Sequence, residues 1–576
     1  MIVDWLSPGL LLALGALIVP LLPLGARKVF LLALPLICIG YLLNIEHGSY
    51  GTFTFLGQEL VTVRVDQLSF VFGLIFLIAA FIGNLFAMHD DDVVQQACAL
   101  IYSGSAVGAV FAGDLVTLFV YWELTAISSV FLIWASRNEE AYKTGMRYLI
   151  IQVGSGVILL SGLMVHAHET GSIAFSSFLD ADDNIAGLGG KLILLAFGIK
   201  CAFPFLHNWL QDAYPKATVT GTVILSAFTT KLAVYSLARG YAGFEPLIYV
   251  GALMTAFPIF FAVIENDLRK VLAYSLNNQL GFMVCGVGVG TAMALNGTAA
   301  HAFSHILYKA LLFMSMGAVL YRCGTAKASE LGGLHRYMPW TTGFCIIGAM
   351  SISAFPLFSG FISKSLILTA AADEGYWFIW AVLLMASAGV MEHSGIKIPF
   401  FAFFGEHRYD WKKRLGHQPK EAPFNMLLAM FITAFLCIFI GVFPDYLYAI
   451  LPYEVDYHPY TTGHVVTQMQ LLMFSVLAFV FLMKTGLYPP EIPSLNLDFD
   501  VVYRRVLPKF IQALGAQIAE MDKGAREWGI GVIKGVMDKT QRTFNPLGPL
   551  GDTGTSGMMA VSVTVMLGVF LLFFFI

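Results

Sequence analysis

Several ionisable side chains lie inside stretches of sequence that are otherwise apolar. The stretch FGIKCAFPFLHNWL, residues 197–210, carries Lys200, Pro204 and His207. An ionisable group at the centre of a lipid bilayer costs about 2.5–3.5 kcal/mol, and proline removes a backbone hydrogen-bond donor from a helix. Comparable apolar stretches also hold Glu123, Lys231, His301, His305, Lys309, Lys364, Glu392, His393 and Lys397. So many costly residues indicate a shared function rather than unrelated structural roles.

These residue types suit the binding and release of protons. Removal from water lowers the pKa of a lysine amine from about 10.4 toward neutrality, and a nearby carboxylate raises it again. A change in the distance between Glu123 and Lys200 would therefore switch this lysine between its charged and neutral forms. Histidine, with an ordinary pKa of about 6.5, suits a relay, and we predict that role for His207, between Lys200 and Lys231. An ammonium group repels cations, so the pattern does not favour Na⁺ or K⁺ binding at the same place.

The spacing of three residues places them on one helix face. His301, His305 and Lys309 follow one another at intervals of four, and side chains at that spacing lie above one another on a helix. They would form a polar ladder through the bilayer. Structural alternatives exist, because an isolated histidine is often only hydrogen-bonded and Glu123 could merely neutralise a lysine. Lys397 lies near the end of its apolar stretch, where we expect its amine to extend to the lipid headgroups.

The elements that position these residues are transmembrane helices. Of the 576 residues, 58% are hydrophobic and 12% are charged, whereas about a quarter of the residues of a soluble protein are charged. Apolar stretches of about 20 residues recur along the chain, as around residues 74–88 and 471–483. The sequence therefore predicts an all-α polytopic membrane protein with about 14–16 transmembrane helices.

Basic residues indicate how the chain is oriented in the membrane. Lys and Arg gather in alternate loops, beginning with Arg27 and Lys28, and loops of this kind face the cytoplasm. Arg64, Lys191 and Arg239 are the exceptions on the opposite side. We therefore expect a multi-pass protein of the bacterial inner membrane whose two termini lie on the outer, periplasmic side.

A short sequence echo indicates an internal repeat. Residues 202–206 read AFPFL and residues 354–358 read AFPLF. Five predicted spans fit between Pro204 and Pro356, and an odd number of spans turns the second copy upside down. The echo predicts two inverted five-helix repeats, each with a helix broken at its proline near the middle of the membrane.

The predicted organisation follows the hydropathy along the chain. We expect N-terminal transmembrane helices in residues 1–90, a first proton-conducting repeat in 91–242, a second in 243–405, C-terminal transmembrane helices in 406–490, an amphipathic segment and linker at the cytoplasmic surface in 491–556, and a final transmembrane helix in 557–576. The amphipathic segment has apolar residues at helical spacing between charged ones. It could equally be a docking surface for a partner subunit.

No catalytic residue, metal site or cofactor is expected from the sequence. The seven cysteines have no metal-ligand spacing. The glycine-rich stretch at residues 286–290 lies in an apolar run with no strand before it, so it is not a dinucleotide-binding motif.

Seven motifs resemble those of one membrane-protein family. In order along the chain they are GDLVTLFVYWEL (113–124), the Lys200 segment that ends in FPFLHNWLQDAYPKA, TTKLAVYSLAR (229–239), DLRKVLAYSL (267–276), HAFSHILYKALLFMSMGAV (301–319), LGGLHRYMP (331–339) and GFISKSLIL (360–368). Over about residues 60–450, the chain resembles the antiporter-like subunits shared by respiratory complex I, membrane-bound hydrogenases and Mrp-type multisubunit cation/proton antiporters. The nearest resemblance is to the D-type subunit of the Mrp-type antiporters.

The resemblance implies roles for most of the ionisable residues. It pairs Glu123 with Lys200, places Lys231 on a path toward the cytoplasm, and makes Lys364 the carrier of the second broken helix. The relay residues that it implies are His301, His305 and Lys309. It also implies a large hetero-oligomer of membrane subunits.

Two stretches depart from the shared motifs. Residues 389–408, which include Glu392, His393 and Lys397, match none of them. The amphipathic segment and the last span loosely resemble the lateral helix and final span of the longest complex I subunit of this type.

Three functions fit these residues. The chain could be the proton-translocating subunit of a Na⁺ or K⁺/proton antiporter, which would make it part of a secondary active transporter rather than an enzyme. It could also be a proton-pumping subunit of a complex I-like or hydrogenase-type redox complex, or the coupling subunit of a bicarbonate uptake system. All three would use the same buried lysine, glutamate and histidine residues. The sequence does not decide which cation moves, the stoichiometry or the direction of net proton flow.

Overall fold

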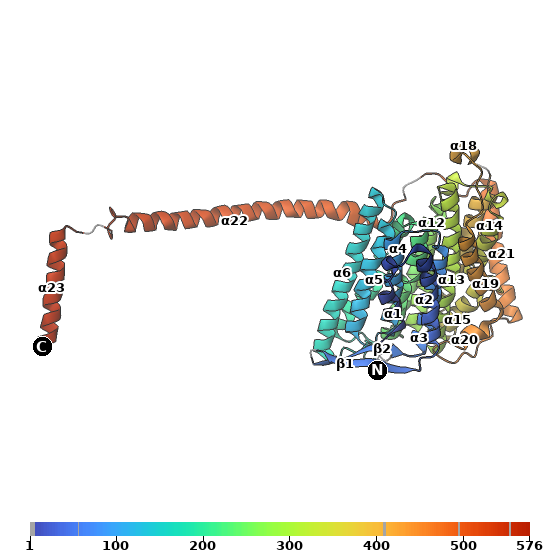
Figure 1. The fold of residues 1–576 in the computed structure, drawn as a ribbon, viewed down its shortest axis with the longest axis horizontal. Helices are drawn as coiled ribbons and strands as arrows, with labels where there is room; N and C mark the ends of the chain where they lie inside the picture. The colour runs from blue at the N-terminus through green and yellow to red at the C-terminus, as the bar shows by residue number, and fades with distance from the viewer. Residues whose placement is uncertain (1–5, 56, 407–410, 494–495, 552–553, 576) are drawn as a thin grey trace. The chain divides into compact units, whose positions relative to one another are not determined.

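Apolar runs that cross lipid form helices, because the backbone has no hydrogen-bond partner there except itself. The protein follows this rule in a computed structural model that describes residues 6–55, 57–406, 411–493, 496–551 and 554–575. The chain divides into two compact units, Met1–Asn496 and Leu497–Ile576, and each is described by itself. Figure 1 shows the first unit as a bundle of helices.

The first unit is built from helices and one hairpin. Its first half contains α1 (Pro8–Gly15), α2 (Leu24–Leu42), β1 (Gly48–Phe55), β2 (Gln58–Val65), α3 (Gln67–Phe86), α4 (Val93–Phe111), α5 (Leu115–Trp134), α6 (Glu139–Thr170), α7 (Gly187–Lys200), α8 (Asn208–Ala213), α9 (Val219–Ala227) and α10 (Thr229–Gly240). Its second half contains α11 (Pro246–Ile264), α12 (Leu268–Val289), α13 (Ala292–Cys323), α14 (Pro339–Ile352), α15 (Ser359–Asp373), α16 (Trp377–Val390), α17 (Lys397–Pro399), α18 (Trp411–Leu415), α19 (Phe424–Val442), α20 (Pro444–Tyr448) and α21 (Thr462–Thr485).

Length and apolar composition identify the membrane spans. Twelve helices of the described residues are long and apolar enough to cross a membrane, which confirms the prediction of an all-α polytopic membrane protein. This number is below the predicted 14–16 partly because α7, α14 and α15, of 14, 14 and 15 residues, are shortened where the chain is broken. One element was not predicted: β1 and β2 pair as an antiparallel hairpin, at the opposite end of the bundle from α18 (Figure 1).

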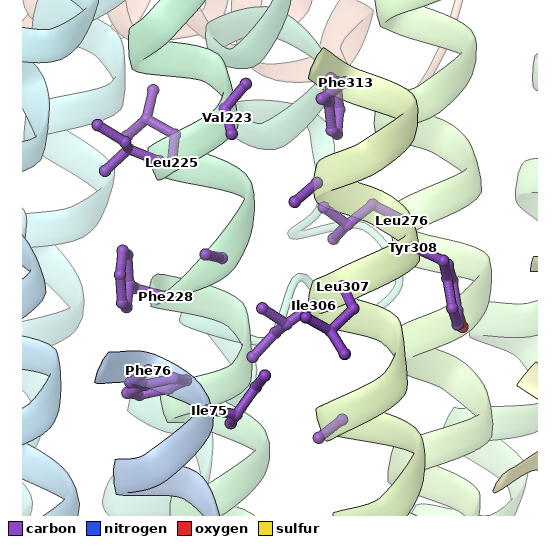
Figure 2. Close-up of a cluster of buried hydrophobic side chains, with 14 of the residues drawn as sticks. Ile75, Phe76, Val223, Leu225, Phe228, Leu276, Ile306, Leu307, Tyr308 and Phe313 are labelled. Atoms are coloured by element: carbon purple, nitrogen blue, oxygen red, sulfur yellow. The ribbon is translucent and has the colours of Figure 1, made fainter. Parts of the chain in front are cut away.

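Helix α13 lies in the middle of the first unit. In the most apolar 18-residue stretch of α13, 94% of the residues are buried. The corresponding shares are 28% in α2 and 17% in α21. Figure 2 shows how side chains from α3, α9 and α13, among them Phe76, Val223 and Ile306, converge on one apolar core. A helix that is buried on all sides carries its polar residues into the interior. The ladder of His301, His305 and Lys309 is therefore surrounded by protein.

The two proline segments have the same backbone conformation. At Pro204, the residue two positions before and the residue after, Ala202 and Phe205, have φ of 61° and 70°. At Pro356, the equivalent residues Ala354 and Leu357 have φ of 58° and 75°. Left-handed residues of this kind end a helix, so α7 ends at Lys200 and α14 ends at Ile352. The inverted relation of the two halves stays a prediction.

Two of the three basic residues that break the charge pattern are neutralised where they lie. Arg239 Nη2 binds Asp66 Oδ1 at 2.7 Å, and Arg64 Nε lies 3.8 Å from Asp66 Oδ2. Burial alone would raise the pKa of Asp66, but the hydrogen bond and charge of Arg239 lower it from 3.8 to about 2. Asp66 is therefore ionised at physiological pH. Because its charge is shared with Arg64 and Arg239, these two arginines are consistent with the orientation that the basic loops predict.

In its described residues, the second unit contains a π-helical turn at Val502–Val506 and two helices, α22 (Leu507–Phe544) and α23 (Ser556–Phe575). The amphipathic segment is thus a single helix of 38 residues. Phe510, Leu514 and Ile518 lie at helical spacing and are exposed, as expected of a helix with one apolar face. Helix α23 is apolar enough to be a span. The six segment boundaries derived from the sequence stay predictions.

Candidate functional site

Lys200 is held by the helix that carries Glu123. Lys200 is the last residue of α7 and is fully buried. Its Nζ donates to the carbonyl oxygen of Trp122 at 2.6 Å and to Thr125 Oγ1 at 2.9 Å. The same nitrogen lies 4.3 Å from the centroid of the Trp122 ring, a distance at which an aromatic face attracts a cation. Both oxygen partners belong to α5 and flank Glu123 along it.

The Glu123 carboxylate lies against a glycine on the neighbouring helix. A Cβ built at Gly156 of α6 would lie 1.3 Å from Glu123 Oε1. Within the described residues, Oε1 is buried without a hydrogen-bond partner, although the charge of Lys200 acts on this carboxylate. Gly156 leaves the space that the acid occupies. It was not predicted from the sequence, because a glycine in an apolar helix gives no sign of what packs against it.

His207 lies between the break at Pro204 and the start of α8. It is buried, and its ring packs edge-on against Phe257 with 4.6 Å between the ring centroids. A relay role for His207 stays a prediction.

Lys231 lies beside a helix interruption that contains no proline. Between α9 and α10, Phe228 has φ −104° and ψ −66°. The backbone amide and carbonyl groups that lose their helical hydrogen bonds there are bound by side chains. The amide of Thr229 donates to the Tyr102 hydroxyl at 3.0 Å. Lys231 Nζ donates to the carbonyl oxygen of Ser226 at 2.5 Å. The fully buried Lys231 therefore caps the end of its own broken helix.

The ladder on α13 contains both bonded and unbonded nitrogens. His301 Nδ1 lies 3.0 Å from Ser363 Oγ, and its Nε2 lies 3.4 Å from the Tyr308 hydroxyl. Across the residues that the structure describes, both ring nitrogens of His305 and the Nζ of Lys309 are buried without a hydrogen-bond partner. The centroids of the two histidine rings are 6.1 Å apart. The charges of Lys231, Lys309 and Lys364 all act on His305.

Lys364 binds the free end of the second broken helix. Its Nζ donates to the carbonyl oxygen of Ile352, the last residue of α14, at 2.7 Å. It also lies 5.2 Å from the centroid of the Phe282 ring. The last carbonyls of a helix carry partial negative charge and attract cations. The structure therefore brings Lys200 and Lys364 to helix ends that the two breaks create.

Lys397 corrects an expectation drawn from hydropathy. The side chain does not extend to the headgroups: it is fully buried and forms an ion pair with Glu491, with 2.8 Å between Nζ and Oε1. Its Nζ also donates to the carbonyl oxygens of Val263 and Glu265 at 2.6 and 2.8 Å. The expectation was wrong because the segment after α21 places Glu491 beside Lys397, so the ammonium has a buried charge partner. Hydropathy along the chain contains no sign of that contact.

Uncharged polar residues accompany the titratable ones. Within the described ranges, the side chains that have buried atoms without a hydrogen-bond partner include Gln152, Gln211, Thr230, Asn277 and Ser304. Thr230 adjoins Lys231, and Ser304 adjoins His305. A buried polar atom without a partner costs about 1–3 kcal/mol, so this concentration is unusual. These residues were not predicted, because only ionisable groups stand out against an apolar sequence.

Comparison with known proteins identifies related chains. Residues 112–389 match the family described as NADH:quinone oxidoreductase/Mrp antiporter, TM. The chain is 26% identical to hydrogenase-4 component B of Escherichia coli K12 over 428 residues, covering 67% of this chain and 63% of that protein. It is 29% identical to the A-type subunit of the Na(+)/H(+) antiporter of Alkalihalophilus pseudofirmus over 505 residues, covering 77% and 61%. That relative is of the A type, whereas the motifs suggested a likeness to the D type.

A solved structure shares the fold. The Mrp complex from Dietzia sp. DQ12-45-1b contains a chain that superposes with a TM-score of 0.78 at 23% identity, covering 92% of this chain and 62% of that chain. The chain thus spans about 61–63% of the length of these three relatives.

Proposed function

Since residues 112–389 match the family described as NADH:quinone oxidoreductase/Mrp antiporter, TM, we propose that this multi-pass membrane protein translocates protons as one subunit of a monovalent cation/proton antiporter. The cation would be Na⁺ or K⁺. The proposal includes other membrane subunits as partners, a bacterial inner membrane as the location, and the orientation that the basic loops predict.

One observation carries the proposal: three buried lysines bind oxygens that accept either form of the amine. In the described chain, the hydrogen bonds that Lys200, Lys231 and Lys364 donate go to backbone carbonyls and one hydroxyl. A neutral amine still has two hydrogens and can keep these bonds, whereas a carboxylate partner would stabilise the charged form. Each lysine can therefore gain or lose a proton without leaving its neighbours unsatisfied.

The remaining residues would connect the three carriers. Glu123, next to the oxygens that bind Lys200, sets how tightly that amine holds its proton. His301, His305 and Lys309 would link Lys231 to Lys364, because the charges of both lysines act on His305 and His301 Nδ1 lies 3.0 Å from Ser363 Oγ, next to Lys364 in the chain. Buried polar atoms without protein partners are sites where ordered water bridges polar groups. Water bound at such atoms would carry protons between the lysines.

The contact between Glu123 and Gly156 yields a test of the first carrier. We expect Gly156→Ala to lower proton-coupled transport by about tenfold to a hundredfold, since a Cβ there displaces the carboxylate and misplaced reacting groups cost rates of this order. Gly154→Ala, where the added Cβ meets no described atom within 4 Å, should transport normally. Both changes lie on α6, so the pair separates the loss of the carboxylate position from an effect on the helix. Equal transport by the two variants would contradict the role given to Glu123.

A second function has support from one relative. The similarity to hydrogenase-4 component B favours a proton-pumping subunit of a redox complex, which would use the same lysines. The two functions differ in what drives the protons: a cation gradient in the antiporter, and electron transfer in a partner subunit of the redox complex.

The deciding experiment is an ion-substitution assay on the whole complex. Inverted membrane vesicles would be prepared from cells that express the complete gene cluster in a host without its own antiporters. A pH-sensitive dye would report the imposed pH gradient. The antiporter predicts that added Na⁺ or K⁺ dissipates the gradient without any reductant. A response that requires an electron donor and quinone would instead assign the redox complex, and no response to either would refute proton translocation.

A further inference from the structure

Beyond this chain of carriers, we propose that His393, Lys397 and Glu491 form a second branch of the proton path, with Glu491 as its terminal acid. The branch rests on the proposed function and extends it to residues outside the region that matches the family, which ends at 389. It would connect Lys309 and Lys364 with the end of the bundle that carries α18.

The ion pair of Lys397 and Glu491, at the end of this branch far from the central carriers, is fully buried. Lys397 and Glu491 side chains are 0% and 2% exposed, with 2.8 Å between Nζ and Oε1. The carbonyl oxygens of Val263 and Glu265 complete the surroundings of the ammonium. A buried ion pair seldom stabilises a fold more than apolar residues of the same size would. Its presence therefore indicates a role other than packing.

His393 lies on a turn that packs against the end of α14, where a Cβ added at Gly395 would meet Ser353 Oγ, next to the Ile352 carbonyl oxygen that Lys364 binds. It precedes Lys397 by four residues, and the charges of Lys309, Lys364 and Lys397 all act on it. The intervening residues form a π-helical turn, Met391–Ile396, a distortion that is frequent at functional sites. The histidine thus lies on the element that joins Lys397 to the end of α14 that Lys364 binds.

The hydrogen bonds of His393 determine which ring nitrogen accepts a proton. Ser394 Oγ donates to Ser275 Oγ at 2.8 Å, so the Ser394 hydroxyl is an acceptor toward His393 Nδ1, which lies 2.9 Å away. His393 Nδ1 therefore carries the hydrogen in the neutral ring. Nε2 is the basic nitrogen, and it is buried with no hydrogen-bond partner among the described residues.

The Glu491 end of the branch lies close to partly exposed groups. The carboxylate of Glu265 binds Lys270 at 2.8 Å, and the Lys270 side chain is 28% exposed. The backbone of Asp267, two residues on, pairs with that of Lys327 in an isolated β-bridge, and the Glu330 carboxylate binds Arg414 of α18 at 2.8 Å. These contacts place the Glu265 loop at the end of the bundle that carries α18. This end holds basic loops, and we predict that it faces the cytoplasm.

The proton balance of the branch is simple. A proton arriving from the Lys309 and Lys364 region binds His393 Nε2 and forms an imidazolium. Lys397 transfers a proton from its ammonium to the Glu491 carboxylate, and the neutral amine takes the proton of His393. Glu491 then releases its proton to water at the Glu265 loop. One proton enters, one leaves, and each group returns to its starting form; the reverse sequence carries a proton from the Glu265 loop to the Lys309 and Lys364 region.

Glu491→Gln tests the terminal acid in the full-length chain within its complex. An amide cannot take up a proton, so we expect cation-driven proton flux in inverted vesicles to fall at least about tenfold, with the amount of assembled complex unchanged on native gels. Glu406→Gln is the matched control, because Glu406 is an exposed acid just after Trp377–Phe404, the span that carries Lys397. It should leave the flux unchanged.

Two further variants separate a proton carrier from a structural contact. His393→Gln keeps a donor for Ser394 but has no basic nitrogen, so it should lose flux as Glu491→Gln does. If Glu491→Gln does not assemble, the flux of His393→Gln tests whether the branch carries protons. The exchange Lys397→Glu with Glu491→Lys restores an ion pair and should restore assembly without flux. Wild-type flux in Glu491→Gln or His393→Gln, or restored flux in the exchange, would overturn the branch. An inactive wild-type complex would instead refute the proposed function.

Discussion

Replacement of Lys200 by methionine should abolish proton-coupled transport, by about a hundredfold or more, while the complex still assembles. The methionine side chain has nearly the same length but binds no proton. The local structure should survive, because Thr125 Oγ1 already donates to the carbonyl oxygen of Trp122 at 2.7 Å. The oxygens that Lys200 binds therefore do not both lose their partner. The measurement is cation-driven dye response in inverted vesicles, with complex abundance read from native gels.

Lys200→Arg distinguishes a proton carrier from a fixed positive charge. Arginine keeps its charge at every physiological pH, so it should be as inactive as methionine if the lysine must release its proton. Active Lys200→Arg would mean that Lys200 is only a static charge. Lys191→Met is the control on the same helix, since Lys191 is exposed, and it should transport normally.

Lys397→Ala should lower the free energy of unfolding by about 3–5 kcal/mol, since the change leaves the buried Glu491 carboxylate without its charge partner. The carbonyl oxygens of Val263 and Glu265 lose a donor as well. Six of the seven cysteines are buried, so a thiol-reactive dye would report unfolding of the purified complex on heating. We expect a clear fall in the apparent melting temperature.

The surface of the same unit offers a matched control. Lys327 pairs with Glu330 at 3.6 Å and its side chain is 52% exposed, so Lys327→Ala should change stability by no more than about 1 kcal/mol. The double variant Lys397→Met with Glu491→Leu removes both charges and should recover much of the loss. Unchanged melting of Lys397→Ala would show that the pair does not hold the segment after α21.

The helix breaks explain why the buried lysines lie where they do. A continuous helix binds its own carbonyl oxygens and offers nothing to a buried ammonium. At the ends of α9 and α14, carbonyl oxygens have no helical hydrogen bond, and Lys231 and Lys364 donate to them. The break therefore offsets part of the cost of burying the amine. The same oxygens remain bonded to a neutral amine, which fits a group that is loaded and unloaded.

Composition and local pattern were sufficient to predict the membrane class and the buried ionisable residues. Lipid requires apolar residues over the whole length of each span, so every residue of a span contributes to the signal and a charged one stands out. Proline also acts locally, through its missing donor and its fixed φ, and the chain is interrupted at both Pro204 and Pro356. The roles of the individual carriers stay predictions.

Three features were decided by tertiary structure alone. The interruption at Phe228 depends on Tyr102, which lies 127 residues from the amide it binds. The space for the Glu123 carboxylate depends on Gly156 of another helix. Lys397 is buried rather than interfacial because Glu491 reaches it from beyond α21. Hydropathy and spacing describe a residue and its neighbours along the chain, whereas the partner that satisfies a buried polar group comes from any element that packs beside it.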